Sequence, residues 1–276
     1  MKKPIRLAVL GDPIAHSKSP SIHQAFANQW GQAVDYQAIH CPLDALASTL
    51  DRLYQEGFQG ANLTVPLKEH ALALCDQLAP AAQVAQAINT VIRTPTGWLG
   101  TNTDGQGLVN DLTDLQVALH NKRVLLIGAG GAAAGVCGPI LDAGVASLAI
   151  LNRTEARAHA LCDHLNDSRV SVLSLEQEQQ PSDPSAFDLI IQATSAGHGG
   201  EIMTPPGTWM DENTVAYDLN YGPAHAIFSQ WAKAQGLMVF DGLGMLVWQA
   251  ALSFERWTGF RPDVQPVLVA LRENDL

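Results

Sequence analysis

The stretch Val124-Leu125-Leu126-Ile127-Gly128-Ala129-Gly130-Gly131-Ala132-Ala133 is the part of this chain that best reveals its architecture. Its four leading apolar residues predict a parallel strand buried on both faces, because such a strand does not alternate with polar residues. The turn Gly128-x-Gly130-x-x-Ala133 follows, and then an Ala-rich helix to about residue 143. Gly128 permits the tight turn, Gly130 lets the backbone approach a pyrophosphate, and Ala133 keeps the helix close to the strand. Strand, turn and helix in this order indicate a dinucleotide site.

The end of the next predicted strand, residues 147–151, indicates which dinucleotide is bound. A carboxylate there would bind the ribose 2′-hydroxyl of NAD, but this strand runs into Asn152-Arg153-Thr154, with Arg157 one helical turn further on. Two guanidiniums and a hydroxyl favour the 2′-phosphate of NADP. The alternative is that Thr154 is only a helix N-cap and that both arginines are solvated surface residues.

Composition limits the class of protein. The 276 residues suffice for one large domain or two ordinary ones, and 47% of them are hydrophobic. A net charge of -11 argues against nucleic acid or an anionic membrane as a partner. The N-terminus has no long apolar run, so neither a signal peptide nor a membrane span is expected. Cys41, Cys75, Cys137 and Cys162 form no Cys-x-x-Cys pair, so we expect no metal site and a reducing, cytoplasmic location.

The first part of the chain alternates strands with helices. Strands are expected at 5–10, 36–40 and 60–65, helices at 19–30 and 43–56, and a β-hairpin at 88–102. Ser19 before Pro20 predicts an N-cap, and Ser17, Lys18 and Ser19 form a candidate anion site. The alternative is that Ser19 serves only as the N-cap and that Ser17 is exposed to solvent, with no anion bound.

Lys68 and Asp104 both lie near the ends of predicted secondary-structure elements. Lys68 follows a strand broken by Pro66 and is expected to open the next helix. The carboxyl end of a strand is where open α/β sheets bind ligands, although an ordinary surface lysine fits as well. The hairpin delivers Asp104 to the start of a helix at 107–117, where a plain N-cap is the alternative role.

From residue 122 onward the strand–helix alternation resumes. Strands are expected at 124–127, 147–151, 170–173, 187–191, 215–219 and 237–240, and a small-residue loop at 192–197 is expected near a nicotinamide. Two helices, 245–257 and 263–274, then follow with no strand between them, so we expect them to fold back on the first domain. The predicted domains are therefore residues 1–104 plus 242–276 and residues 105–241.

Several motifs recur together in one order along essentially the whole chain. They are Gly11 to Pro20 (GDPIAHSKSP), Asn62 to Lys68 (NLTVPLK), Ala87 to Val91 (AINTV), Thr101 to Gly105 (TNTDG), the Gly128 to Ala133 turn, Asn152-Arg153-Thr154, Ala193 to Gly197 (ATSAG) and Gly242 to Ala251 (GLGMLVWQAA). In this combination the sequence resembles the shikimate dehydrogenase family. The resemblance implies an α/β fold with two domains: an N-terminal mixed open-sheet substrate domain and a Rossmann-type doubly wound NADP-binding domain.

The resemblance also implies an activity, the reversible NADPH-dependent reduction of 3-dehydroshikimate to shikimate in aromatic amino-acid biosynthesis. Lys68 and Asp104 would be the catalytic pair. Substrate contacts would come from Ser17, Ser19, Thr64, Asn89, Asp104, Tyr221 and Gln249. NADP contacts would come from Gly128, Ala129, Gly130, Gly131, Ala132, Asn152, Arg153, Thr154, Arg157, Thr194, Ser195, Leu219, Gly242 and Met245.

Two positions depart from the family pattern, and three rival functions share parts of it. Gln192 stands where asparagine is common, and the segment after Pro223 lacks the usual Thr-Pro.

The rivals are a quinate/shikimate dehydrogenase using NAD(P), a catalytically silent NADP-binding sensor, and the folate-linked dehydrogenases. The intact Lys68 and Asp104 argue against a sensor, and Ser17, Ser19 and the arginines favour the biosynthetic enzyme. The expected assembly is a monomer or homodimer.

Overall fold

The computed structural model describes residues 3–174, 186–194 and 202–273, and it divides into two compact units. Unit 1 comprises Met1–Gly107 and Leu246–Leu276, and unit 2 comprises Leu108–Met245. The chain passes from one unit to the other inside two helices, α4 (Asp104–Asp114) and α8 (Leu243–Thr258).

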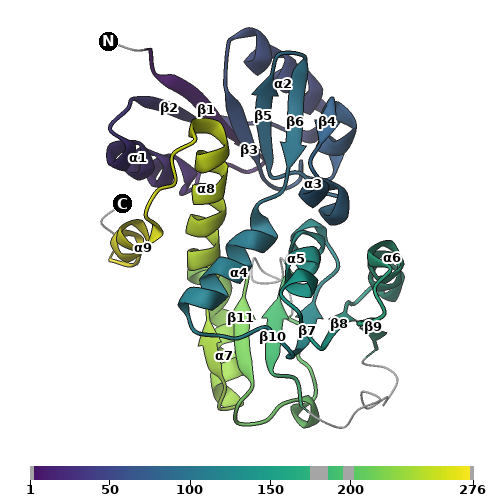
Figure 1. The fold of residues 1–276 in the computed structure, drawn as a ribbon. Helices are drawn as coiled ribbons and strands as arrows, with labels where there is room; N and C mark the ends of the chain where they lie inside the picture. The colour runs from purple at the N-terminus through teal and green to yellow at the C-terminus, as the bar shows by residue number, and fades with distance from the viewer. Residues whose placement is uncertain (1–2, 175–185, 195–201, 274–276) are drawn as a thin grey trace. The chain divides into compact units, whose positions relative to one another are not determined.

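Unit 1 is built on a mixed sheet of six strands in the order β2-β1-β3-β5-β6-β4 (Figure 1). The strands are β1 (Ile5–Gly11), β2 (Val34–His40), β3 (Gly60–Leu63), β4 (Gln77–Leu78), β5 (Thr90–Thr94) and β6 (Gly97–Thr101). β1 pairs in parallel with β2 and β3, whereas the β5–β6 hairpin pairs antiparallel with β3. The hairpin returns the chain to the carboxyl end of β3, next to the segment that carries Lys68.

Helices cover this sheet at β1, because its residues Leu7, Ala8, Val9 and Leu10 alternate between the two faces and all four are buried. The helical segments of unit 1 are α1 (Ser19–Trp30), η1 (Leu43–Ala45), α2 (Leu46–Gln55), η2 (His70–Leu74), α3 (Pro80–Ala85) and α9 (Val264–Arg272). On one face, Leu46, Leu50 and Leu53 of α2 join a core with Ala8 and Leu10 of β1. α1 also packs against α8 and α9: Phe26 lies 5.7 Å from Phe254 between ring centroids, and Gln29 exchanges hydrogen bonds with the backbone of Asp263.

Unit 2 contains an all-parallel sheet in the order β12-β11-β10-β7-β8-β9. Its strands are β7 (Arg123–Ile127), β8 (Ser147–Leu151), β9 (Val170–Leu173), β10 (Leu189–Gln192), β11 (Val215–Asp218) and β12 (Met238–Phe240). Counted along unit 2, this is the strand order 3-2-1-4-5-6 of the dinucleotide-binding fold. The order reverses between β7 and β10, the switch point at which such sheets bind ligands. The predicted α/β class is therefore confirmed.

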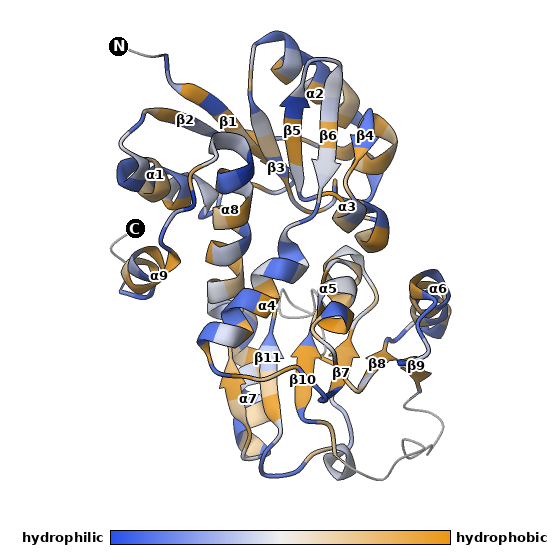
Figure 2. Cartoon of the chain, in the orientation of Figure 1, coloured by the Kyte–Doolittle hydropathy of each residue, from blue (hydrophilic) through white to orange (hydrophobic). Residues whose placement is uncertain are grey.

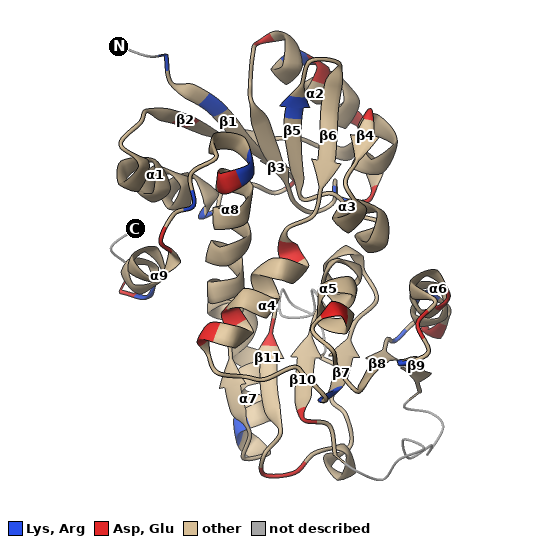
Figure 3. Ribbon diagram, in the orientation of Figure 1, with Lys and Arg blue, Asp and Glu red and all other residues tan. Residues whose placement is uncertain are grey.

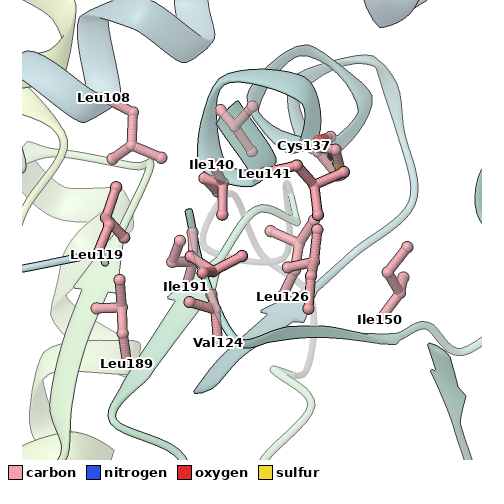
Figure 4. Close-up of a cluster of buried hydrophobic side chains, with 14 of the residues drawn as sticks. Leu108, Leu119, Val124, Leu126, Cys137, Ile140, Leu141, Ile150, Leu189 and Ile191 are labelled. Carbon is pink, nitrogen blue, oxygen red and sulfur yellow. Dashed lines mark hydrogen bonds between the residues drawn. The ribbon is translucent and has the colours of Figure 1, made fainter. Parts of the chain in front are cut away.

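The strands of unit 2 are apolar on both faces, so helices cover both (Figure 2). The helical segments of unit 2 are α5 (Gly131–Asp142), α6 (Glu155–Leu165), η4 (Gly207–Trp209), η5 (Gly222–His225) and α7 (Ala226–Ala234). Figure 4 shows Val124, Leu126 and Ile191 facing Ile140 of α5 on one side. On the other, Leu125 and Ile127 pack in a cluster with Phe228 and Ala232 of α7.

Some local expectations were wrong. Ser19 is not an N-cap: it is the first residue of α1, and its N–H donates to Oγ of Ser17 at 3.3 Å. Lys68 does not open a helix, because the next helical segment is the short η2. α4 begins at Asp104 rather than near Gly107, and Oδ1 of Asn102 accepts from the Asp104 N–H at 2.9 Å in the turn before this helix. Strand β4, only two residues long, was not predicted.

In the part of the chain that the structure describes, no helix combines the length and apolar character needed to cross a membrane.

Candidate active site

Lys68 and Asp104 form an ion pair in unit 1. Nζ of Lys68 lies 2.7 Å from Oδ2 of Asp104, and their side chains are 19% and 6% exposed. Lys68 comes from the turn after β3, and Asp104 from the first residue of α4. Both positions lie near sheet ends that the hairpin brings together. An ion pair whose lysine is still partly exposed can exchange a proton with a bound molecule.

Asn89 fixes the other oxygen of this carboxylate. Its Nδ2 donates to Oδ1 of Asp104 at 2.8 Å. The orientation of the Asn89 amide follows from its other partners, because Oδ1 accepts from the Thr103 N–H at 2.9 Å, a group that can only donate. Asp104 is therefore held at both oxygens, by an ammonium and by an amide.

Gln249 reaches the same cluster from α8. Its Oε1 accepts from Nδ2 of Asn89 at 3.2 Å, and its Nε2 donates to the Leu246 carbonyl at 2.9 Å. Thr103 joins both residues, since its hydroxyl accepts from Asn89 at 2.8 Å and donates to the Gln249 carbonyl at 3.0 Å. The sequence did not single out Thr103. Its position directly before Asp104, in TNTDG, was the available signal.

Behind Asn89 lies a buried polar network that the sequence did not predict. Nδ2 of Asn62 contacts the hydroxyls of Thr90 and Ser253, each at 3.1 Å. The Thr90 hydroxyl donates to Oδ1 of Asn89 at 2.8 Å. Oδ1 of Asn62 accepts from the Tyr36 hydroxyl at 2.7 Å. A fully satisfied buried network makes its members rigid, so the Asn89 amide is fixed from behind as well.

The residues expected to bind a carboxylate lie on the loop after β1. Ser19 is 8% exposed and hydrogen-bonds Tyr36, whose pKa burial raises well above its ordinary value. Ser17 is half-buried, and its Oγ faces the Ser19 N–H. Thr64 follows β3, its N–H donating to the Leu10 carbonyl at 2.9 Å. A Cβ on Gly11 would lie 2.4 Å from Cγ2 of Thr64, so glycine is needed there to keep this loop close to Thr64.

The glycine-rich turn of unit 2 connects β7 to α5. Gly128 has φ +124°, and a Cβ there would approach the Ala193 backbone to 3.1 Å. Gly130 differs: its φ is -95°, and a Cβ there would meet nothing within 4 Å. Among the residues that the structure describes, none requires glycine at Gly130, so the space around its Cα is available to a ligand. Gly131 and Ala132 begin α5, where backbone N–H groups have no helical partner and favour an anion. Ala129, between the two glycines, packs partly against the core.

The residues between β8 and α6 do not form the side-chain N-cap that was the alternative role for Thr154. Thr154 occupies the N-cap position of α6 but makes no side-chain capping bond. Nδ2 of Asn152 donates to the Thr154 carbonyl at 2.8 Å. Arg153 and Arg157 are exposed, on the loop and the first turn of α6. The two guanidiniums therefore stand in solvent beside the strand end, where an anion can reach them.

The remaining predicted cofactor residues follow the ends of β10, β11 and β12, except for Met245, which lies in the first turn of α8. Thr194 and Leu219 are half-buried, and Met245 is buried in the core. Close packing requires glycine at position 242, because a Cβ there would lie 2.3 Å from the Leu219 carbonyl oxygen. Tyr221, predicted as a substrate contact, lies in unit 2, and burial raises the pKa of its phenol. Ser195 lies outside the described residues.

Gln192, which departs from the family pattern, hydrogen-bonds the backbone of the loop after β10. Its Oε1 accepts from the Thr194 N–H at 3.1 Å. Its Nε2 is buried and has no hydrogen-bond partner among the residues that the structure describes.

Three family models match successive parts of this chain. The shikimate dehydrogenase substrate binding domain matches residues 9–91, shikimate / quinate 5-dehydrogenase matches 111–200, and the shikimate 5′-dehydrogenase C-terminal domain matches 242–272. The chain is also 47% identical, over 276 residues, to the shikimate dehydrogenase (NADP(+)) of Xanthomonas euvesicatoria pv. vesicatoria (strain 85-10). The match covers 98% of this chain and 96% of that protein.

Solved structures agree with the sequence comparison. An Ael1 enzyme from Pseudomonas putida is 39% identical with a TM-score of 0.88, covering 96% of this chain and 97% of its own. Shikimate 5-dehydrogenase from Thermus thermophilus, in complex with NADP(H) and shikimate, is 36% identical with a TM-score of 0.85, covering 98% and 99%. On the identity and coverage of these matches, the chain belongs to the shikimate dehydrogenase family.

Proposed function

We propose that this protein is an NADP-dependent shikimate dehydrogenase, an oxidoreductase that reversibly reduces 3-dehydroshikimate to shikimate in aromatic amino-acid biosynthesis. The observation that carries the proposal is the Lys68–Asp104 pair, held by Asn89 in a chain whose relative from Xanthomonas is a shikimate dehydrogenase. A protein that only sensed NADP would have no use for this pair.

The reduction needs a proton source beside the substrate carbonyl. As a hydride reaches the carbonyl carbon, the oxygen gains negative charge and takes up a proton. The Lys68 ammonium supplies that proton and stabilises the charge, and Asp104 holds Nζ in place at 2.7 Å. In the reverse direction, neutral Lys68 accepts the proton from the C3 hydroxyl. A positioned acid–base group of this kind contributes about 10²- to 10⁴-fold in rate.

Neighbouring side chains hold the rest of the substrate. We assign the ring hydroxyls to Asp104, Asn89, Thr64 and Gln249, and the carboxylate to Ser17, Ser19 and Tyr221. The assignment is supported by the hydrogen bonds that join Asn89 to Asp104 and Gln249, and by the partial exposure of the Ser17 side chain.

The residues of unit 2 fit NADP. When bound, NADPH supplies the hydride. The open space at Gly130 and the first N–H groups of α5 suit the pyrophosphate, and we assign Gly128, Ala129, Gly131 and Ala132 to the same turn. Arg153, Arg157, Asn152 and Thr154 suit the 2′-phosphate. We place the nicotinamide near Thr194, Ser195, Leu219, Gly242 and Met245. Unit 1 is thus the substrate domain and unit 2 the cofactor domain.

The partners that we propose are small molecules only, and the chain works in the cytoplasm as a monomer or homodimer. All four cysteines are free thiols, as a reducing compartment would leave them, and burial raises the pKa of Cys75 and Cys137 to about 12. Light scattering during gel filtration distinguishes the two assembly states.

The test of the proposed function is the loss of NADPH absorbance when purified protein is mixed with 3-dehydroshikimate. The same reaction is run with NADH, and the reverse one with quinate in place of shikimate. Fast loss with NADPH, little with NADH and no turnover of quinate support the proposal. Turnover of quinate with NAD would assign the protein to the quinate/shikimate branch. No turnover despite tight NADPH binding would leave a sensor.

A further inference from the structure

Asp218 is a fully buried carboxylate that the proposed reaction does not use. The six strands of the unit 2 sheet carry two charged residues, Arg123 at the start of β7 and Asp218 at the end of β11 (Figure 3). Asp218 is 0% exposed. Burying a charged or polar group costs free energy unless hydrogen bonds replace its hydration, so its partners matter.

Asn220 and His225 provide those hydrogen bonds. Oδ1 of Asp218 accepts from both the backbone N–H of Asn220, at 3.0 Å, and its Nδ2, at 2.8 Å. Oδ2 of Asp218 lies 3.1 Å from Nδ1 of His225, which is 16% exposed. His225 belongs to the segment where the family's usual Thr-Pro is missing.

Asn220 in turn connects three segments of unit 2. Its Nδ2 donates to the Thr194 carbonyl, in the loop after β10, at 3.0 Å. Its own carbonyl accepts from the Gly242 N–H, just before α8, at 2.9 Å. A single residue after β11 thus holds the loops that follow the two neighbouring strands.

Thr194 is also held from its other side. Gln192 accepts from the Thr194 N–H, and Asn220 donates to the Thr194 carbonyl. Both peptide groups flanking this residue are therefore fixed by side chains. Gly242 packs closely against the backbone of Leu219, because a Cβ at residue 242 would lie 2.3 Å from the Leu219 carbonyl oxygen.

We infer that Asn220, anchored by Asp218 and His225, is a positioning residue for hydride transfer. The inference rests on the proposed function, which places Thr194 and Gly242 beside the nicotinamide. Ligands bind at the carboxyl ends of strands in such sheets, and those are the ends that Asn220 joins. Misplacement of a reacting group by about 1 Å costs on the order of 100-fold in rate. The Asn220 side chain acts through Thr194 and does not contact the substrate, whereas the bond to Gly242 is made by the backbone carbonyl and remains in an alanine variant.

The test compares Asn220→Ala with Asn213→Ala, which removes an exposed asparagine from the same unit. NADPH affinity is measured by fluorescence titration of the protein without substrate. Asn220→Ala is expected to weaken it several-fold and to lower kcat about 10-fold or more. The KM for 3-dehydroshikimate should change less than about two-fold, because the residues assigned to the substrate, apart from Tyr221, lie in unit 1. The isotope effect with deuterated NADPH should rise as hydride transfer becomes rate-limiting. Wild-type affinity and kcat in Asn220→Ala would overturn the inference.

A second pair of variants covers the case in which Asn220→Ala does not fold. In His225→Asn, the amide nitrogen can take the place of Nδ1, whereas His225→Ala leaves Asp218 without this donor. We expect His225→Asn to retain most NADPH affinity and kcat, and His225→Ala to lose both. Equal losses would show that the bond to Asp218 is not what matters. If the wild-type protein bound NADPH but did not turn over, the proposed function would fail. The titrations would still decide whether Asn220 shapes the cofactor site.

Discussion

Nδ2 of Asn89 lies 2.8 Å from Oδ1 of Asp104, the carboxylate oxygen that Lys68 does not contact. This hydrogen bond gives the carboxylate a second anchor, so Asp104 cannot rotate away from the ammonium. The position of Lys68 therefore depends on an amide one residue before β5, and through Thr103 on the start of α4.

Replacing Asn89 with alanine should slow the reaction strongly. Oδ1 of Asp104 would lose a buried donor, and leaving a buried acceptor without a hydrogen bond costs about 1–3 kcal/mol, or more when it is charged. We expect kcat to fall about 10- to 100-fold, with a smaller rise in the KM for 3-dehydroshikimate. Steady-state kinetics beside Asn28→Ala, an exposed residue of α1, provide the comparison. Unchanged kcat would mean that Asp104 does not need this anchor.

Arg153→Ala should affect NADPH and not NADH. A guanidinium that pairs with the 2′-phosphate has no partner in NADH, so the KM for NADPH should rise about 10-fold or more while that for NADH stays constant. The exposed Arg261→Ala serves as a charge-matched control. A parallel rise for both cofactors would exclude Arg153 as the residue that distinguishes them.

Gly130→Ala should weaken NADPH binding while leaving the free energy of unfolding nearly unchanged. A Cβ at Gly130 meets no atom of residues 3–174, 186–194 or 202–273 within 4 Å. The free energy of unfolding should therefore change by no more than about 1 kcal/mol. NADPH affinity should nevertheless fall at least about 10-fold, because the methyl group occupies space meant for the pyrophosphate. Gly128→Ala is the contrast, since φ +124° at that position predicts a large loss of stability. Normal NADPH binding by a stable Gly130→Ala protein would refute this site.

His23 should make the protein less stable in mild acid. The ring is fully buried, and burial lowers the pKa of His23 from 6.5 to about 3, outweighing the opposite effect of its contact with Asn62. Between these values the unfolded chain binds a proton that the folded protein excludes. This histidine therefore lowers the free energy of unfolding by up to about 1.4 kcal/mol for each pH unit of acidification. Urea unfolding at about pH 7 and about pH 4.5 should show a steeper decline for wild type than for His23→Leu. Equal slopes would contradict the buried neutral ring.

The sequence was most informative where local pattern determines structure. The apolar run at Val124–Ile127, the glycine turn after it, and Pro95-Thr96-Gly97 between two strand patterns each act over a few residues, and each element formed as expected. Helix starts were less predictable because several polar residues competed for the cap. Ser19 is the first residue of α1 rather than its N-cap, whereas Asp263 is a side-chain N-cap, because it accepts from the Gln265 N–H at the start of α9.

The polar network behind the candidate site could not be predicted from one sequence. Ser253 contacts Asn62 across 191 positions in the chain, and the Thr103 hydroxyl reaches the carbonyl of Gln249 across 146. Such contacts exist only once α8 lies against the sheet of unit 1. Lys68 and Asp104 were identified through the family motifs. Their pairing at 2.7 Å is a product of the fold.

The most direct test of Lys68 as the proton donor is a single-turnover experiment. Wild-type protein and Lys68→Ala, each saturated with NADPH, are mixed with 3-dehydroshikimate while NADPH absorbance is followed. We predict that the rate of NADPH oxidation falls about 10²- to 10⁴-fold in Lys68→Ala, with substrate affinity within a few-fold of wild type. Oxidation at a near-normal rate in the variant would remove Lys68 from the chemistry and contradict the proposed mechanism.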